Sequence, residues 1–389
     1  MNVSSTCDYL DWDVAFLLQT VVSYPLSIAA ILSNAVCIRL VPKVGIFPAN
    51  VKLLLISISL AALFISITFL VRAFVNTAIM FLGFGSVSLR TSQCSAVDSP
   101  YSVASTFFIL AMLAMALERA YETAKVRSNK VHSPGVSGEK SSKAAKLLLL
   151  LICALSPIWA AQSQSQGRRG DRVYCYCNAV TIRESYNSWV GKSIYFTVEI
   201  FTIILTGCVW KVNRDRLADF NIHTKQHSLH SRYQASNNMK TTAMLFPYVL
   251  VHTAFYLVII IMTYCFGRIT QERNNGYQSI DLINLQVCLT LVSCVDLIIG
   301  PFIWMRNHRG LKTLAANKYP FLKRFLTKST PVTTAGPSNH DLAAPRGQGP
   351  APRATQINLA TVSAPNKVVE YRVKPDHHRQ ILENLWAKK

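Results

Sequence analysis

The second long apolar stretch of the chain, residues 53–78, reads LLLISISLAALFISITFLVRAFVNTA. It contains a single charged residue, Arg72. A helix needs about 20 mostly apolar residues to cross the hydrocarbon core of a bilayer, and this stretch exceeds that length. The sequence here predicts a membrane-spanning α-helix, and the number of comparable stretches elsewhere in the chain decides the fold.

Seven stretches of this kind follow one another along the chain. The second, fourth and sixth are strongly apolar, whereas the fifth and seventh contain polar residues such as Glu199 and Asp296. Helices that line a polar interior carry such residues, so both stretches are counted as predicted spans. The seven predicted spans cover residues 14–38, 53–78, 99–118, 145–164, 190–210, 242–266 and 282–304. The predicted fold is an all-α membrane protein, a seven-transmembrane helix bundle over residues 14–304.

The composition fits a membrane protein better than a soluble one. Hydrophobic residues make up 51% of the 389 residues and charged residues 15%, against about 25% charge in soluble domains. The net charge of +21 would also be compatible with a nucleic-acid-binding protein. The basic residues, however, lie between and after the apolar stretches, which favours a role in membrane topology and no nucleic-acid partner.

The same basic residues predict the orientation of the chain. None precedes the first predicted span, whereas 15 follow the seventh. Loops rich in Lys and Arg stay in the cytosol, so we expect residues 1–13 to be extracellular and the C-terminus to be cytosolic. Such an arrangement requires an odd number of spans, as the seven apolar stretches provide.

Four cysteines fall on the predicted outer side, which is the oxidising side. A disulfide between Cys94 and either Cys175 or Cys177 would tie the start of the third span to the second outer loop. Free thiols, or a bridge that involves Cys7, are the alternatives. Asn2 begins an Asn-x-Ser triplet and is a candidate glycosylation site.

The third predicted span ends with Glu118 and Arg119, and Arg119 follows Cys94 by 25 positions. A helix of that length extends about 37 Å, whereas the hydrocarbon core is about 30 Å thick. Cys94 is therefore expected at the outer boundary of the membrane and Arg119 at the inner one. Rhodopsin-like receptors have a disulfide cysteine and an acidic residue–Arg pair at a similar spacing. This resemblance implies a latch, in which Glu118 holds Arg119 at rest and releases it for G-protein coupling; ordinary charged residues at a membrane boundary are the alternative.

Several short segments, in their order along the chain, resemble nematode serpentine chemoreceptors of the alpha/beta group (Sra superfamily). They are 47–55 (FPANVKLLL), 118–123 (ERAYET), 231–234 (SRYQ), 301–304 (PFIW) and 306–309 (RNHR). The resemblance covers residues 15–315. It implies a G-protein-coupled receptor for environmental chemicals, with a small-molecule ligand and a heterotrimeric G protein as partners. It also implies a multi-pass protein of the plasma membrane, expected in the cilia of sensory neurons.

The chain departs from the rhodopsin-like pattern at three places. The second span has Ser57 and Ser59 but no Asp, no Trp stands just before Pro247, and Gly300 rather than Asn precedes Pro301. These departures argue against a sodium pocket and a switch of the rhodopsin kind.

Polar residues of the later spans are candidates for a ligand pocket inside the bundle. A carboxylate at mid-membrane costs a few kcal/mol, so Glu199 is expected to face the interior, where it contacts a ligand or pairs with His252 or another helix. For Asp296, a structural or conformational role is expected. The pocket candidates are Tyr195, Glu199, His252, Tyr256 and Asn284.

The segments after the seventh span differ in character. Residues 305–328 are predicted to form an amphipathic segment on the membrane surface, with basic residues around Leu311, Leu314 and Ala315. Residues 329–389 are predicted to be a disordered cytosolic tail. The basic loop 211–240 is expected to meet anionic membrane lipid or an acidic partner surface, or only to set the topology.

The sequence carries no motif for a metal, a cofactor or a catalytic set, which disfavours an enzyme. Cys175 and Cys177 lack the spacing of metal ligands. The main alternative to a receptor is a transporter or channel that uses the polar residues of the later spans. Transporters often contain internal repeats, and the two halves of this chain show no such similarity.

Overall fold

A computed structural model describes the chain in eight segments. They are residues 14–45, 47–82, 89–128, 146–159, 173–174, 186–222, 229–274 and 280–327. The chain divides into residues 1–330 and 331–389, and every described residue belongs to the first unit. Asn2, Cys7, Cys175 and Cys177 lie outside the described residues, as does the predicted tail beyond residue 327.

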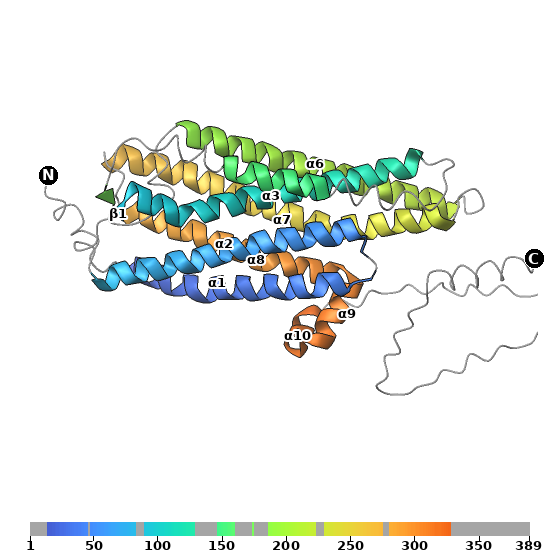
Figure 1. Ribbon diagram of the computed structural model, residues 1–389, viewed down its shortest axis with the longest axis horizontal. Coiled ribbons are helices and arrows are strands. Elements are labelled where there is room, and N and C mark those ends of the chain that lie inside the picture. Colours follow the sequence, from blue (N-terminus) through green and yellow to red (C-terminus); the bar gives the residue numbers. More distant parts are fainter. Residues whose placement is uncertain are drawn as a thin grey trace, which may run out of the picture. The chain divides into compact units, whose positions relative to one another are not determined.

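The described part of the chain is a bundle of seven apolar helices (Figure 1). Six of them are long and apolar enough to cross a membrane, and the helix Lys146–Trp159 is apolar but shorter. The six long helices are α1 (Val14–Leu40), α2 (Ala49–Leu82), α3 (Thr91–Ser128), α6 (Tyr186–Ile222), α7 (Leu229–Asn274) and α8 (Ile280–Asn307). The predicted seven-helix membrane fold is confirmed.

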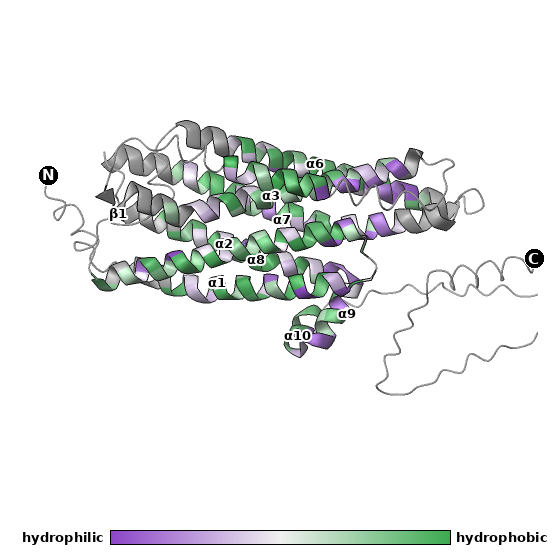
Figure 2. Ribbon diagram, viewed as in Figure 1, coloured by the Kyte–Doolittle hydropathy of each residue, from purple (hydrophilic) through white to green (hydrophobic). Residues whose placement is uncertain are grey.

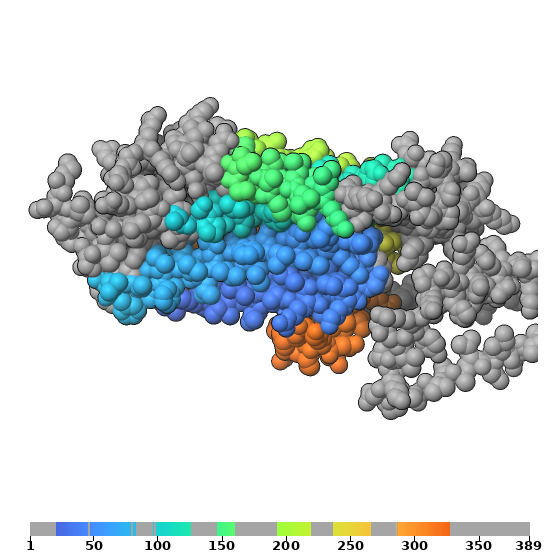
Figure 3. All heavy atoms as spheres, in the orientation of Figure 1, coloured from blue at the N-terminus to red at the C-terminus, as the bar shows by residue number. Residues whose placement is uncertain are grey.

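The six long helices close into a ring. Each packs against its neighbour in the order α1, α2, α3, α6, α7, α8, and α8 returns to α1, while α3 also contacts α7 across the ring. The helix Lys146–Trp159 adds Ile152 to the core and sets the Trp159 ring 6.2 Å from that of Tyr195 on α6. In Figure 3 this helix, in green, lies on the surface of the face in view.

The bundle is apolar outside and partly polar inside, as expected of a protein surrounded by lipid. Large apolar side chains such as Phe64, Leu150 and Leu250 are exposed, whereas Glu118, Glu199 and other polar groups are buried. Figure 2 shows apolar residues along much of the described helices. Many interior hydroxyls donate a hydrogen bond to the backbone carbonyl four residues earlier in their own helix, so they need no partner from outside that helix. They include Ser57, Ser66, Thr68, Thr106, Ser156, Thr202 and Thr206.

A two-stranded pairing stands at the end of the bundle where α3 begins. Strand β1 (Leu89–Arg90) pairs antiparallel with β2 (Val173–Tyr174), with Leu89 opposite Tyr174 and Arg90 opposite Val173. The side chain of Cys94 is not described, so the disulfide with Cys175 or Cys177 stays a prediction. The strand pairing does join the two segments that such a bridge would link.

Two short helices follow α8 at the opposite end of the bundle. A turn of 3₁₀ helix, η3 (Val41–Lys43), follows α1 there, and α9 (Arg309–Lys318) packs against α8 and α1. Leu311 and Ala315 of α9 are buried. Helix α10 (Pro320–Thr327) packs on α9, and Pro320 stands at its start, where a missing N–H does no harm.

His308 holds the junction between α8 and α9. Its Nδ1 accepts a hydrogen bond from the Leu311 backbone N–H at 3.3 Å, which caps α9, and its ring lies 4.3 Å from the Phe47 ring. The pKa of His308 is lowered from its usual 6.5 by burial and by the positive charge of Lys240. The neutral imidazole is therefore the form that fits this junction.

Acid is expected to weaken the protein through His308. Because its pKa is lower in the folded state than in the unfolded one, its stabilising contribution is complete above pH 6.5 and is lost as pH falls through the folded value. The thermal unfolding midpoint of the purified protein should fall over this range. In His308→Asn, which keeps a capping side chain but cannot titrate, this part of the pH dependence should disappear; an unchanged pH profile would contradict the assignment.

Candidate functional site

Glu118 and Arg119 lie together near the end of α3, and both are buried inside the bundle. The Arg119 guanidinium forms an ion pair with the Glu118 carboxylate and donates to both of its oxygens. The Glu118 carboxylate also accepts from Asn50 Nδ2 of α2 at 3.5 Å. A buried charge is tolerated only when it is paired and hydrogen-bonded, and these contacts meet that condition for both residues.

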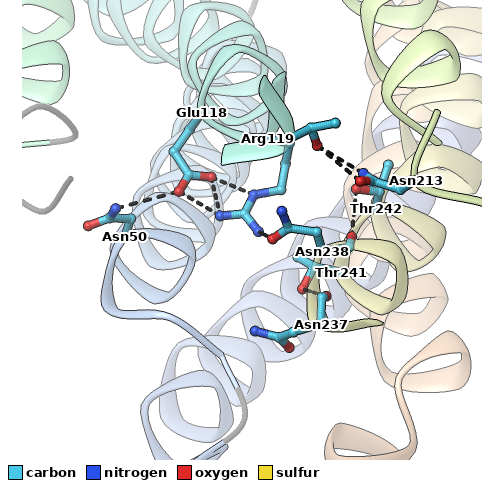
Figure 4. Close-up of polar contacts among 9 residues, drawn as sticks. Asn50, Glu118, Arg119, Asn213, Asn237, Asn238, Thr241 and Thr242 are labelled. Atoms are coloured by element: carbon cyan, nitrogen blue, oxygen red, sulfur yellow. Dashed lines mark hydrogen bonds and ion pairs between the residues drawn. The ribbon is translucent and has the colours of Figure 1, made fainter. Parts of the chain in front are cut away.

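Arg119 also reaches across the bundle to α7. Its Nη1 donates to Asn238 Oδ1 at 3.1 Å (Figure 4). The sequence analysis did not single out Asn238. The sequence feature that could have pointed to it is the amide pair Asn237–Asn238, which lies just before the sixth predicted span. In Figure 4 the Asn237 side chain points away from Arg119, so the two neighbouring amides have different surroundings.

A further set of bonds joins the end of α3 to α6. The Thr123 hydroxyl accepts from Asn213 Nδ2 at 2.9 Å, and the Arg216 guanidinium donates to the Thr123 carbonyl. The end of α3 is thus tied by side chains to α2, α6 and α7. We call this group the latch cluster; its members are Asn50, Glu118, Arg119, Thr123, Asn213 and Asn238.

A second polar group lies in the middle of the bundle and joins α6, α7 and α8. His252 Nδ1 lies 2.6 Å from Asp296 Oδ2, and His252 Nε2 lies 3.4 Å from Glu199 Oε1. The Thr253 hydroxyl donates to Glu199 Oε2 at 2.9 Å. Glu199, His252 and Asp296, which we call the acid–imidazole trio, are all buried.

The trio has a definite charge requirement. Both nitrogens of the His252 ring face a carboxylate oxygen, and a neutral imidazole carries a hydrogen on only one of them. A ring with hydrogens on both nitrogens can donate to Asp296 at 2.6 Å and present its second hydrogen toward Glu199 at 3.4 Å. Charged side chains are costly at this depth, so the trio depends on keeping the acidic and basic groups together.

One face of α7 connects the trio with the latch cluster. Five residues spaced four or three apart lie on this face, and all are buried. They are Asn238, Thr241, Leu245, Tyr248 and His252. From Asn238 to His252 is 14 positions, or about 21 Å along a helix. A rotation or tilt of α7 as a whole therefore moves the partners of both clusters at once.

Tyr248 fills the space between the two clusters. Its ring packs edge-on against Trp304 of α8 with centroids 5.0 Å apart, and lies 5.9 Å from the His252 ring. It also sits directly over Gly300: a Cβ atom added there would lie 2.6 Å from Tyr248 Cε2. At this level α7 and α8 approach too closely for a larger residue before Pro301.

The remaining pocket candidates differ in their described surroundings. The Tyr195 hydroxyl lies 2.6 Å from Thr106 Oγ1 of α3. Tyr256 is half-buried one turn from His252, and the side chain of Asn284 is not described. Glu199 was expected either to contact a ligand or to pair with His252 or another helix. The described contacts include the pairing with His252.

Asn34 is a further interior residue that the sequence analysis missed. Its amide donates to the Leu297 carbonyl of α8 at 3.0 Å and to the Ala30 carbonyl of its own helix at 2.9 Å. An amide within an apolar stretch must find a partner on another helix, and this was the available signal. The bond fixes α1 against α8 one residue after Asp296.

Replacing the imidazole should strongly destabilise the bundle. In His252→Leu, Glu199 and Asp296 lose their basic partner, which costs ~3–5 kcal/mol for a broken buried pair. The measurement is thermal unfolding in detergent, with the lipid-facing change Leu250→Ala as control. Adding Asp296→Asn to His252→Leu should recover part of the loss, because it removes one unpaired charge; equal stability of His252→Leu and the control would disprove the trio.

Comparison with known proteins supports the receptor fold. The family described as serpentine type 7TM GPCR receptor class ab chemoreceptor matches residues 14–312. Squid rhodopsin, in its crystal structure, superposes with a TM-score of 0.58 at 14% sequence identity, covering 88% of this chain and 91% of that one. No curated protein sequence matches significantly. Within the described residues, no group of His, Cys, Asp or Glu side chains is arranged to hold a metal ion.

Proposed function

Because this chain belongs to the serpentine 7TM GPCR family of class ab chemoreceptors, we propose that it binds a small environmental chemical within its helix bundle and activates a heterotrimeric G protein. The observation that carries this proposal is the buried Arg119 guanidinium, which is shared between Glu118 of α3 and Asn238 of α7. That contact crosses the ring of helices at one end, where a partner has access when the helices separate.

The latch cluster describes a closed state. Arg119 is 1% exposed, and its partners Glu118 and Asn238 are buried as well. An outward movement of α7 would break the bond to Asn238 while Glu118 moves with α3. The guanidinium would then offer free N–H groups to backbone carbonyls of a partner, as the resemblance to rhodopsin-like receptors implies for Glu118 and Arg119.

The orientation that we propose puts the latch cluster at the cytosolic end of the bundle. The basic residues that follow α8 lie at this end of the bundle, and the positive-inside rule assigns them to the cytosol. The N-terminus and the β1–β2 end then face the outside, where Asn2 and the Cys94 bridge would belong. A plasma-membrane location in sensory cilia is part of the same proposal.

The proposed ligand acts from the middle of the bundle through α7. Tyr195, Glu199, His252, Tyr256 and Asn284 belong to the helices that meet at the acid–imidazole trio. A ligand with a polar group that bonds to Glu199 or His252 would compete with the trio. Because His252 and Asn238 share one face of α7, loss of the trio contacts would loosen the α3–α7 bond as well.

The test uses a neighbouring pair of identical residues. A hydrogen bond to a charged group is worth about 1.5–3 kcal/mol, so Asn238→Ala should raise basal nucleotide exchange on a co-expressed G protein roughly tenfold or more. Asn237→Ala removes the adjacent amide, which points away from Arg119, and should leave basal exchange unchanged.

Arg119→Ala completes the test. With surface expression intact, it should abolish both the basal signal and the increase caused by Asn238→Ala, because the partner loses its anchoring cation. Equal basal exchange in Asn237→Ala and Asn238→Ala would refute the latch. Ionic currents in cells that express the protein without any G protein would instead favour the transporter or channel alternative.

A further inference from the structure

All charged residues in the stretch of chain that follows Asp296 are basic. Residues 297–340 contain no Asp or Glu and seven Lys or Arg residues. The segment therefore has no acidic side chain of its own to neutralise it. Positive charge of this density at the end of a spanning helix favours contact with anionic lipid.

Part of this charge lines a hollow at the junction of α8 and α9. The hollow is open to solvent and has a volume of about 490 Å³. Its charged side chains are Arg306, Arg309 and Lys312, and hydrogen-bonding groups come from Asn307, Thr313 and Asn317. None of the described residues that line it is acidic. We call it the α8–α9 hollow.

The elements that carry these residues are firmly placed. Leu311 and Ala315, on the other face of α9, are fully buried against the bundle. His308 caps the start of α9 with its side chain, and its carbonyl accepts from the backbone N–H of Lys312 at 2.9 Å. The basic groups of the hollow therefore project from a fixed helix, which reduces the entropy cost of binding.

The position of the hollow suits a lipid headgroup. The apolar span of α8 ends at Asn307, which itself lines the hollow. In α10, Phe321 and Phe325 are 65% and 70% exposed and lie four positions apart, while Leu322 and Leu326 are buried. Exposed aromatic rings beside basic residues are typical of a helix at the membrane interface.

We propose that the α8–α9 hollow binds the headgroup of a membrane lipid that carries phosphomonoester groups, such as a phosphorylated inositol lipid. The planar guanidinium groups of Arg306 and Arg309 each match a phosphate with two parallel hydrogen bonds, and Lys312 adds a third positive charge. Three cations suit a headgroup with several negative charges better than one with a single charge. Only the assignment of this lipid to the cytosolic leaflet rests on the proposed orientation.

Binding is measured on the full-length protein in nanodiscs, without a G protein, so the result is independent of the proposed function. Discs contain phosphatidylcholine with either a bisphosphorylated inositol lipid or enough phosphatidylserine to give equal charge. The inositol lipid should bind at least tenfold more tightly and raise the thermal unfolding midpoint. Equal effects of the two lipids would overturn the proposal.

Matched variants separate the hollow from general basic charge. Arg306→Gln/Arg309→Gln should lower the affinity for the inositol lipid at least tenfold, and Lys312→Gln alone should lower it less. Lys323→Gln/Arg324→Gln removes two charges from α10, outside the hollow, and should keep the affinity within about twofold. An equal loss in the α10 variant would refute the site, and so would soluble inositol phosphate that binds as tightly as the lipid.

Discussion

The buried guanidinium of Arg119 sets the arrangement of one end of this molecule. Its N–H groups are enclosed by the bundle, so their partners must come from other side chains. Glu118 supplies the charge, and Asn50 fixes Glu118 from α2, while Asn238 supplies an acceptor from α7. Three helices must therefore stand at defined distances before the guanidinium can be buried. Thr123, Asn213 and Arg216 add α6 to the same constraint.

The acid–imidazole trio imposes a comparable constraint in the middle of the bundle, but with different chemistry. There each contact joins two titratable groups, whereas the cross-helix bond of the latch cluster ends on a neutral amide. Breaking the trio strands a charge in a medium of low dielectric constant, whereas breaking the Arg119–Asn238 bond leaves the guanidinium still paired with Glu118. The middle of the bundle is therefore the more costly place to open, and the latch end is the less costly one.

The sequence predicted the features that depend on the order of residues along the chain. It did not predict those that depend on which residues are neighbours in the folded structure. Apolar length predicted the number of helices, and adjacency in sequence made the Glu118–Arg119 pair visible. The cost of a carboxylate in the membrane placed Glu199 toward the interior, but it does not say which helix faces meet, so Asp296 was missed as a partner of His252. Asn238 and Asn213 were not singled out for the same reason, since amides near a span boundary are common. The disulfide stays a prediction, because Cys94, Cys175 and Cys177 have no described side chains. The role of each site residue also stays a prediction.

The interior face of α7 explains how two clusters of unequal strength can act together. Tyr248 occupies the level between them, packed on Trp304 and pressed over Gly300, so α7 and α8 cannot slide freely past each other there. A tilt of α7 about the Tyr248–Gly300 contact, next to Pro247 inside the helix, would leave His252 near its carboxylate partners. A tilt displaces the far end of the helix most, and Asn238 lies about 21 Å along the helix from His252. Such a tilt displaces Asn238 more than His252, because Tyr248 lies ten positions from Asn238 and four from His252.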